Sequence, residues 1–148
     1  MFFTVPIAVV IVSVFPVSLP VSLFHGICFL VATLFSFLIL AEVNFLLGLT
    51  AFFFKSIDGI SRAKYVLIQL LSGLLLPLAF FPDWCRGFVE ALPFKHISHT
   101  PLQFYLGKIP VSKALPIFLQ EFIWWLVLLV LGQLLYSKAV RKLTLQGG

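Results

Sequence analysis

Long apolar runs separated by short polar stretches dominate the pattern of this 148-residue chain. The runs that are long enough to cross a membrane cover residues 2–19, 21–54, 65–81 and 114–136. A helix of about 20 apolar residues crosses the hydrocarbon core of a bilayer. The pattern therefore predicts an all-α fold: a polytopic membrane helical bundle with about four transmembrane helices.

The first two runs each leave alternatives open. Residues 1–19 carry no charge, and a signal peptide there would need a basic start and a small-residue cleavage site, neither of which is present. The second run is interrupted only by His25, Glu42 and Asn44. As one helix it would measure about 51 Å, against about 30 Å of hydrocarbon. We therefore expect it to tilt, to project into water or to break, at 41–44 or at Gly48.

The stretch between the last two runs, residues 82–107, is amphipathic and interrupted. Apolar residues such as Phe88 alternate with charged ones such as Glu90, while Pro93 and Pro101 break the pattern and Gly107 closes it. Such a segment cannot cross a bilayer, because unpaired backbone groups in lipid cost several kcal/mol each. It predicts an outer re-entrant or interfacial helical hairpin between the last two spans.

Composition favours a membrane protein over a soluble one. Hydrophobic residues make up 61% of the chain and charged residues only 10%, outside the range of soluble domains. The length leaves room for a single transmembrane domain, residues 1–148, and for no soluble catalytic domain. The net charge of +5 is better explained by basic residues that set the membrane topology than by a surface that binds nucleic acid. We therefore expect the lipid bilayer as a partner and no nucleic acid.

Basic residues are distributed unevenly over the predicted layout. Six lie close to span ends, in the 55–64 loop and in the tail: Lys55, Arg62, Lys64, Lys138, Arg141 and Lys142. Four are spread over the longer hairpin segment: Arg86, Lys95, Lys108 and Lys113. Under the positive-inside rule this asymmetry predicts a multi-pass protein of the cell membrane, with both termini cytoplasmic and the hairpin outside.

Several motifs in the second half of the chain resemble a known family. They are SGLLLPLAFFPDW at 72–84, ALPF at 91–94, TPLQFYLGK at 100–108, a last span that bears tryptophan, and AVRKLTLQGG at 139–148. These motifs make the chain similar to the C-terminal four spans of ABC-2 type transporter permeases, the membrane subunits of ABC exporters. The resemblance implies a permease that pairs with a second permease chain, while a separate ABC ATPase subunit hydrolyses ATP to drive export.

The resemblance also implies roles for particular positions. It implies an outer lid formed by Pro77, Phe81, Pro82, Trp84, Pro93, Phe94 and Pro101. It further implies an ATPase-facing loop that contains Lys55, Asp58, Gly59, Arg62 and Lys64. Chains of this family begin with an amphipathic helix and two further spans, so we expect this sequence to lack the N-terminal two spans of a full permease.

Two polar positions in the second run are candidates for a translocation path. A carboxylate at the centre of a span costs about 2.5–3.5 kcal/mol, so Glu42, together with Asn44, would face a cavity or a partner. Alternatively, the helix already leaves the membrane at this point. Glu121, in the last span, is expected at the outer interface beside Lys113 or Lys108.

Catalytic and metal-binding motifs are absent from the sequence. His96 and His99 are three residues apart, but prolines crowd the segment and no HExxH spacing supports a metal site. There is no GxSxG elbow, no glycine-rich phosphate loop and no Walker motif. The sequence thus predicts no catalytic residue, no metal and no cofactor. A permease subunit of an ABC exporter is the leading hypothesis, a small helical membrane scaffold or regulatory subunit is the alternative, and a membrane enzyme is a third option.

Overall fold

The computed structural model describes residues 20–50 and 57–146. All regular structure in that part of the chain is helical: α2 (Leu23–Thr50), α3 (Ile57–Leu71), η1 (Leu78–Phe80), α4 (Asp83–Ala91), α5 (Lys95–Tyr105), η2 (Val111–Lys113) and α6 (Ala114–Gln146). The predicted span at 2–19 and Lys55 lie outside the described residues. The all-α prediction is confirmed for the residues described.

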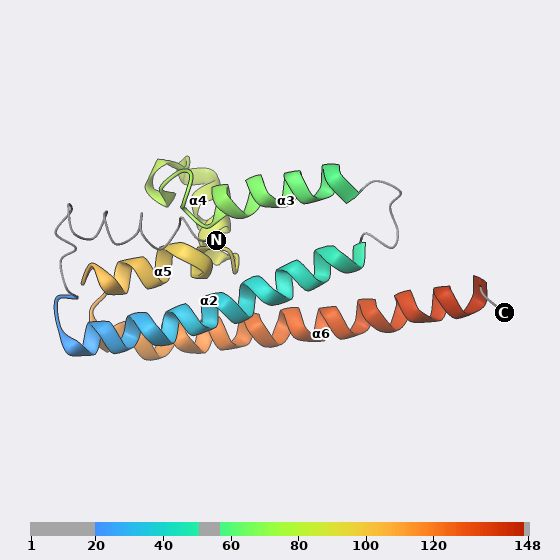
Figure 1. Cartoon of the computed structure of the whole chain (residues 1–148). Helices are drawn as coiled ribbons and strands as arrows, with labels where there is room; N and C mark the ends of the chain where they lie inside the picture. Colours follow the sequence, from blue (N-terminus) through green and yellow to red (C-terminus); the bar gives the residue numbers. More distant parts are fainter. Residues whose placement is uncertain (1–19, 51–56, 147–148) are drawn as a thin grey trace, which may run out of the picture.

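The two long helices, α2 and α6, form the base of the structure. They lie side by side and run in the same direction (Figure 1). Each supplies a stretch long and apolar enough to cross a membrane, Leu23–Leu49 and Val111–Val140. Within the described residues two candidate spans are therefore present, and the predicted count of four is not confirmed.

Both long helices are more continuous than the sequence suggested. α2 is a single helix of 28 residues, about 42 Å long, so that of the three alternatives the break at 41–44 or at Gly48 does not occur. No proline interrupts it, and a glycine inside a helix costs only about 1 kcal/mol. α6 continues past residue 136, its expected end, to Gln146, because residues 138–142 are mostly strong helix formers.

α3 is shorter than the span predicted at 65–81, because it ends at Leu71. Gly73 has a φ of +79°, a left-handed conformation that favours glycine. The backbone N–H groups of Gly73 and Leu74 turn back to the carbonyls of Leu70 and Gln69, which is the Schellman arrangement of a helix end. At 15 residues, α3 measures about 22 Å and is too short to cross a bilayer alone.

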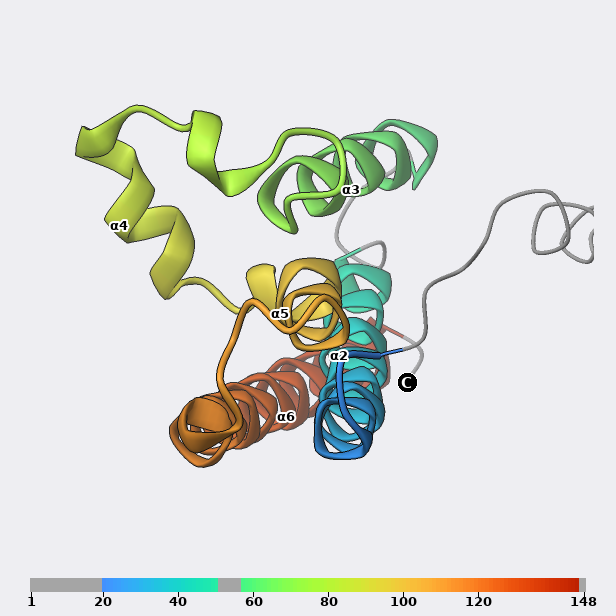
Figure 2. The same ribbon diagram turned by 90° about the vertical axis from the view of Figure 1, so that its left-hand side faces the viewer.

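Two short helices, α4 and α5, occupy the segment predicted as a helical hairpin. α5 lies along the first half of α2 and runs opposite to it, while α3 runs in the same direction as α5 over the second half (Figure 1). Seen end-on, α5 sits over the α2–α6 pair, α3 lies beyond α5, and α4 projects to the side (Figure 2). The chain thus returns along α2 in two pieces, with η1 and α4 inserted between them.

The core follows one stripe of α2. Its buried residues recur at helical spacing: Cys28, Ala32, Ser36, Ile39 and Val43. The first two pack in an apolar cluster with Phe104 and Ala114, and the last two pack in a second cluster with Leu128. A serine therefore separates two apolar clusters at the middle of the bundle.

The end of α5 provides a test of this packing. Gly107 has a φ of +66°, and a Cβ there would lie 2.7 Å from Cγ2 of Val21. We expect Gly107→Ala to lower the free energy of unfolding by about 2 kcal/mol or more, from left-handed strain together with the clash. Gly87→Ala is the control, since Gly87 lies in α4 with open space around it. Thermal unfolding of the full chain in detergent measures both, and a Gly107→Ala protein as stable as the control would contradict the described turn.

Candidate functional site: a buried polar cluster

Four polar side chains are buried where α2, α5 and α6 meet. Ser36 comes from α2, His96 and Thr100 from α5, and Glu121 from α6. Their residues are 7%, 1%, 4% and 0% exposed, respectively. We call these four residues the polar cluster. Buried polar groups are usually paired, so the partners of each atom indicate what the cluster can do.

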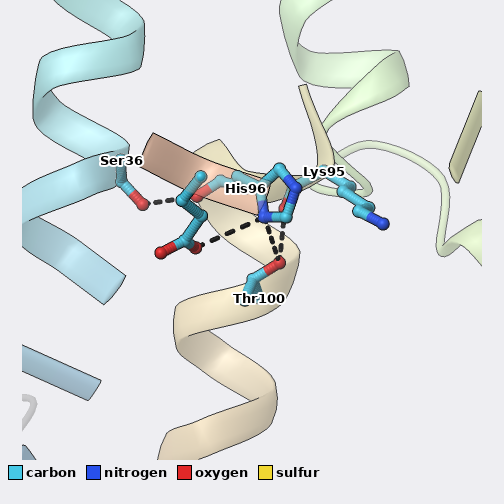
Figure 3. Close-up of polar contacts among 5 residues, drawn as sticks. Ser36, Lys95, His96 and Thr100 are labelled. Atoms are coloured by element: carbon cyan, nitrogen blue, oxygen red, sulfur yellow. Dashed lines mark hydrogen bonds and ion pairs between the residues drawn. The ribbon is translucent and has the colours of Figure 1, made fainter. Parts of the chain in front are cut away.

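Contacts within the polar cluster tie the three helices together. The Ser36 hydroxyl donates a hydrogen bond to the backbone carbonyl of His96 (Figure 3). Nδ1 of the His96 ring lies 3.2 Å from Oγ1 of Thr100, one helical turn further along α5. The same Nδ1 lies 3.3 Å from Oε1 of Glu121 on α6. The imidazole of His96 is therefore the hub of the cluster.

Some atoms of the cluster have no hydrogen-bond partner among the described residues. These are Nε2 of His96 and both carboxyl oxygens of Glu121, whose approach to His96 is close but lacks hydrogen-bond alignment. Leaving a buried polar atom unpaired costs about 1–3 kcal/mol. The cluster is thus not explained by stability alone.

The charge state of His96 follows from its surroundings. α5 lies outside the two candidate spans. Burial, together with the nearby positive charges of Lys95 and His99, lowers the pKa of His96 from 6.5 to about 3. The ring is therefore neutral at pH 7. Its contact with Glu121 is one between a carboxyl group and a neutral imidazole, and it is not a pair of full charges.

A pocket of about 210 Å³ opens beside the polar cluster. His96 and Thr100 form part of its wall, together with the neighbouring α5 residues Lys95 and His99. α4 contributes Glu90, and α6 contributes Gln120. Charged and hydrogen-bonding groups from three helices therefore converge on one hollow.

The chain also matches a known family as a whole. The family model described as ABC-2 family transporter protein matches residues 1–147. The chain belongs to the ABC-2 transporter family. No curated protein and no solved structure matches it. This ABC-2 chain is accordingly a membrane transport component that is not itself catalytic, and ATP hydrolysis belongs to a separate subunit.

The two candidates for a translocation path in this ABC-2 chain face different helices. Oδ1 of Asn44 accepts a hydrogen bond of 2.9 Å from Nζ of Lys64 on α3. Glu42 is half-buried, and its Oε2 would lie 3.5 Å from a Cβ placed on Gly132 of α6. The structure therefore does not bring Glu42 and Asn44 together.

The position predicted for Glu121 is wrong. It was expected at the outer interface beside Lys113 or Lys108, whereas it is fully buried and faces His96. An ionisable residue inside an apolar run usually faces the bundle interior, and that rule would have found Glu121. No comparable signal identifies Ser36, because a serine in an apolar helix can bond to its own backbone.

The predicted lid residues fall into two groups. Trp84 is 86% exposed on α4, Pro77 and Pro82 are exposed before η1 and α4, and Phe81 is half-buried. Pro93 and Pro101 are buried, and Phe94 packs against the second apolar cluster. The first group lies on the surface, and the second anchors α5.

The predicted ATPase-facing loop is mostly a helix. α3 begins at Ile57, so Asp58, Gly59, Arg62 and Lys64 belong to its first turns, and Lys55 lies outside the described residues. Arg62 and Gly59 are exposed, whereas Lys64 is bound to Asn44. Arg62, Ala63 and Lys64 are strong helix formers, which explains why the polar stretch does not remain a loop.

Acid should destabilise the fold through His96. Its pKa in the folded protein, about 3, is lower than the ordinary 6.5, so between these values the unfolded chain binds more protons. Stability is thus fully present above pH 6.5 and falls as the pH drops towards 3, by roughly 1.4 kcal/mol per unit at most. Thermal unfolding in detergent between pH 7.5 and 4.5 measures the slope. His96→Asn should flatten it, and an unchanged slope in this variant would contradict the assignment.

Proposed function

We propose that the chain is the permease subunit of an ATP-driven ABC exporter, in which it forms the translocation path with a second permease chain above a separate ATPase. The observation that carries the proposal is the match of the ABC-2 family over residues 1–147. The two long apolar helices and the lack of a catalytic motif in the sequence support a subunit that moves a substrate without transforming it.

Exposed apolar side chains support a partner chain and a lipid environment. One face of α6 exposes large residues at helical spacing, among them Leu115, Leu119 and Phe122. Such a surface is stable only against lipid or another apolar surface. In the proposal, lipid covers part of it and the second permease chain covers another part.

In the proposed orientation both termini are cytoplasmic and the α4–α5 hairpin belongs to the outer side. Gly107 meets Val21 at one end of the bundle, whereas α3 begins at the opposite end (Figure 1). The lid would then consist of α4 with its exposed Trp84 and of Phe94 at the start of α5, which exclude water until the permease opens. Glu42 would line the path beside Gly132.

The first turns of α3 would face the ATPase. A charge reversal at the exposed Arg62 should therefore weaken copurification of an ABC ATPase with the tagged chain, by about tenfold for a charge at an interface. Arg86→Glu is the matched control, because Arg86 is an exposed arginine on α4, which lies away from the first turns of α3 (Figure 1). Retention of the ATPase by wild type and Arg86→Glu, together with its loss from Arg62→Glu, supports the proposal. If no ATPase and no second permease chain copurify from native membranes, the chain is a scaffold.

Orientation can be tested through the two cysteines. Cys28 is buried, whereas Cys85 on α4 is half-buried, so a thiol reagent reports mainly on Cys85. We expect a membrane-impermeant maleimide to label Cys85 from outside intact cells, with Cys85→Ser removing the label. Modification only by reagents that enter the cytosol would invert the proposed layout.

A further inference from the structure

The interruption between α3 and α5 places a helix start deep in the bundle. Ser36, which binds the carbonyl of His96, is the central residue of the candidate span Leu23–Leu49. α5 therefore begins halfway along α2 and runs back towards its start (Figure 1). No side chain of the described residues caps this start. The start of a helix carries partial positive charge, and interrupted membrane helices present such ends to anionic groups.

The pocket beside this helix start contains a cation without a close ion-pair partner among the described residues. Its one carboxylate, Glu90, already forms an ion pair of 2.9 Å with Arg86. Lys95 also lines the pocket, and the carboxylates of Glu90 and Glu121 act on it only at longer range, because it has no ion-pair partner within 4 Å among the described residues. The half-buried His99 adds a hydrogen-bonding ring on the same helix. The local balance of charge therefore favours an anion.

A buried ring nitrogen without a partner among the described residues belongs to a residue of the pocket wall. His96 lines the pocket, is 1% exposed, and has no partner for Nε2 within the described part of the chain. Figure 3 shows this ring with Nδ1 towards Thr100 and its other nitrogen on the side of Lys95. When Thr100 donates to Nδ1, the proton of the ring lies on Nε2, which is then a donor; when Thr100 donates instead to the backbone carbonyl of Lys95, 3.5 Å away, Nε2 is an acceptor.

We propose that this pocket binds a phosphate group. Lys95 supplies the charge, and His99 and Gln120 supply hydrogen bonds. These donors come from two helices, α5 and α6, which suits a tetrahedral phosphate better than the two coplanar oxygens of a carboxylate. The phosphate can belong to a phospholipid headgroup or to a free phosphate or phosphate monoester. The site belongs to the chain itself and does not require a docked ATPase.

The test uses the full chain purified in detergent, with one arm for each source of phosphate. In the first arm, inorganic phosphate is titrated into delipidated protein by calorimetry. In the second, the chain is taken from nanodiscs of phosphatidylglycerol and phosphatidylcholine, and the phospholipid retained after detergent exchange is counted by native mass spectrometry. Lys95→Gln is compared with Lys113→Gln, which removes the same charge from an exposed position outside the pocket.

We expect Lys95→Gln to weaken binding at least tenfold in the arm that shows it, and Lys113→Gln to change it less than twofold. Loss in the calorimetric arm identifies free phosphate, and loss of retained lipid identifies a headgroup. No binding in either arm, or equal loss in both variants, overturns the proposal. Circular dichroism and gel filtration check folding. If Lys95→Gln misfolds, His99→Gln decides with the same two outcomes, since His99 is only half-buried.

Discussion

The packing of α5 on the first half of α2 is the constraint on which the rest of the structure depends. The Ser36–His96 hydrogen bond fixes where α5 begins, and Phe104 buries the other part of α5 against the first apolar cluster. Glu121 and Ala114 bring α6 to the same seam. Because the chain enters α5 from α4 and leaves it towards α6, this one placement positions both neighbours.

Two glycines allow this placement of α5, because they end helices within an otherwise apolar stretch. Residues 65–105 contain enough apolar residues to suggest a long crossing, but Gly73 ends α3 and Gly107 ends α5, both in left-handed conformations. At each helix end the same pair of Schellman-type hydrogen bonds pairs backbone carbonyls, for which lipid offers no donor. The interruption therefore leaves few backbone groups unpaired, and short helices can lie within the bundle.

The sequence pattern predicts the long helices α2 and α6, but it does not predict where the helices end. Apolar runs identify α2 and α6 because burial in lipid needs only length and hydropathy. The end of α3 at Leu71 was not predicted. The apolar run continues on both sides of Gly73, and its length favoured a span to residue 81 over a helix end at that glycine. Of the site, Glu121 could have been recognised from its position in an apolar run. The contact between Ser36 and His96 could not, since it joins residues 60 apart in sequence through a backbone carbonyl.

The polar cluster could set the register of α5 or bind a ligand. The hydrogen-bond partners of its atoms distinguish between these two roles. A buried polar network often specifies one arrangement of helices at a cost in stability. The hydroxyl of Ser36 accounts for that role by itself, because it binds a backbone carbonyl that any residue at position 96 would offer. Among the described residues, the buried Nε2 of His96 has no hydrogen-bond partner, and Lys95 beside it has no ion-pair partner. Register does not explain these two residues, which both line the pocket. Those two side chains are explained better by a group that enters the pocket than by the packing of the helices.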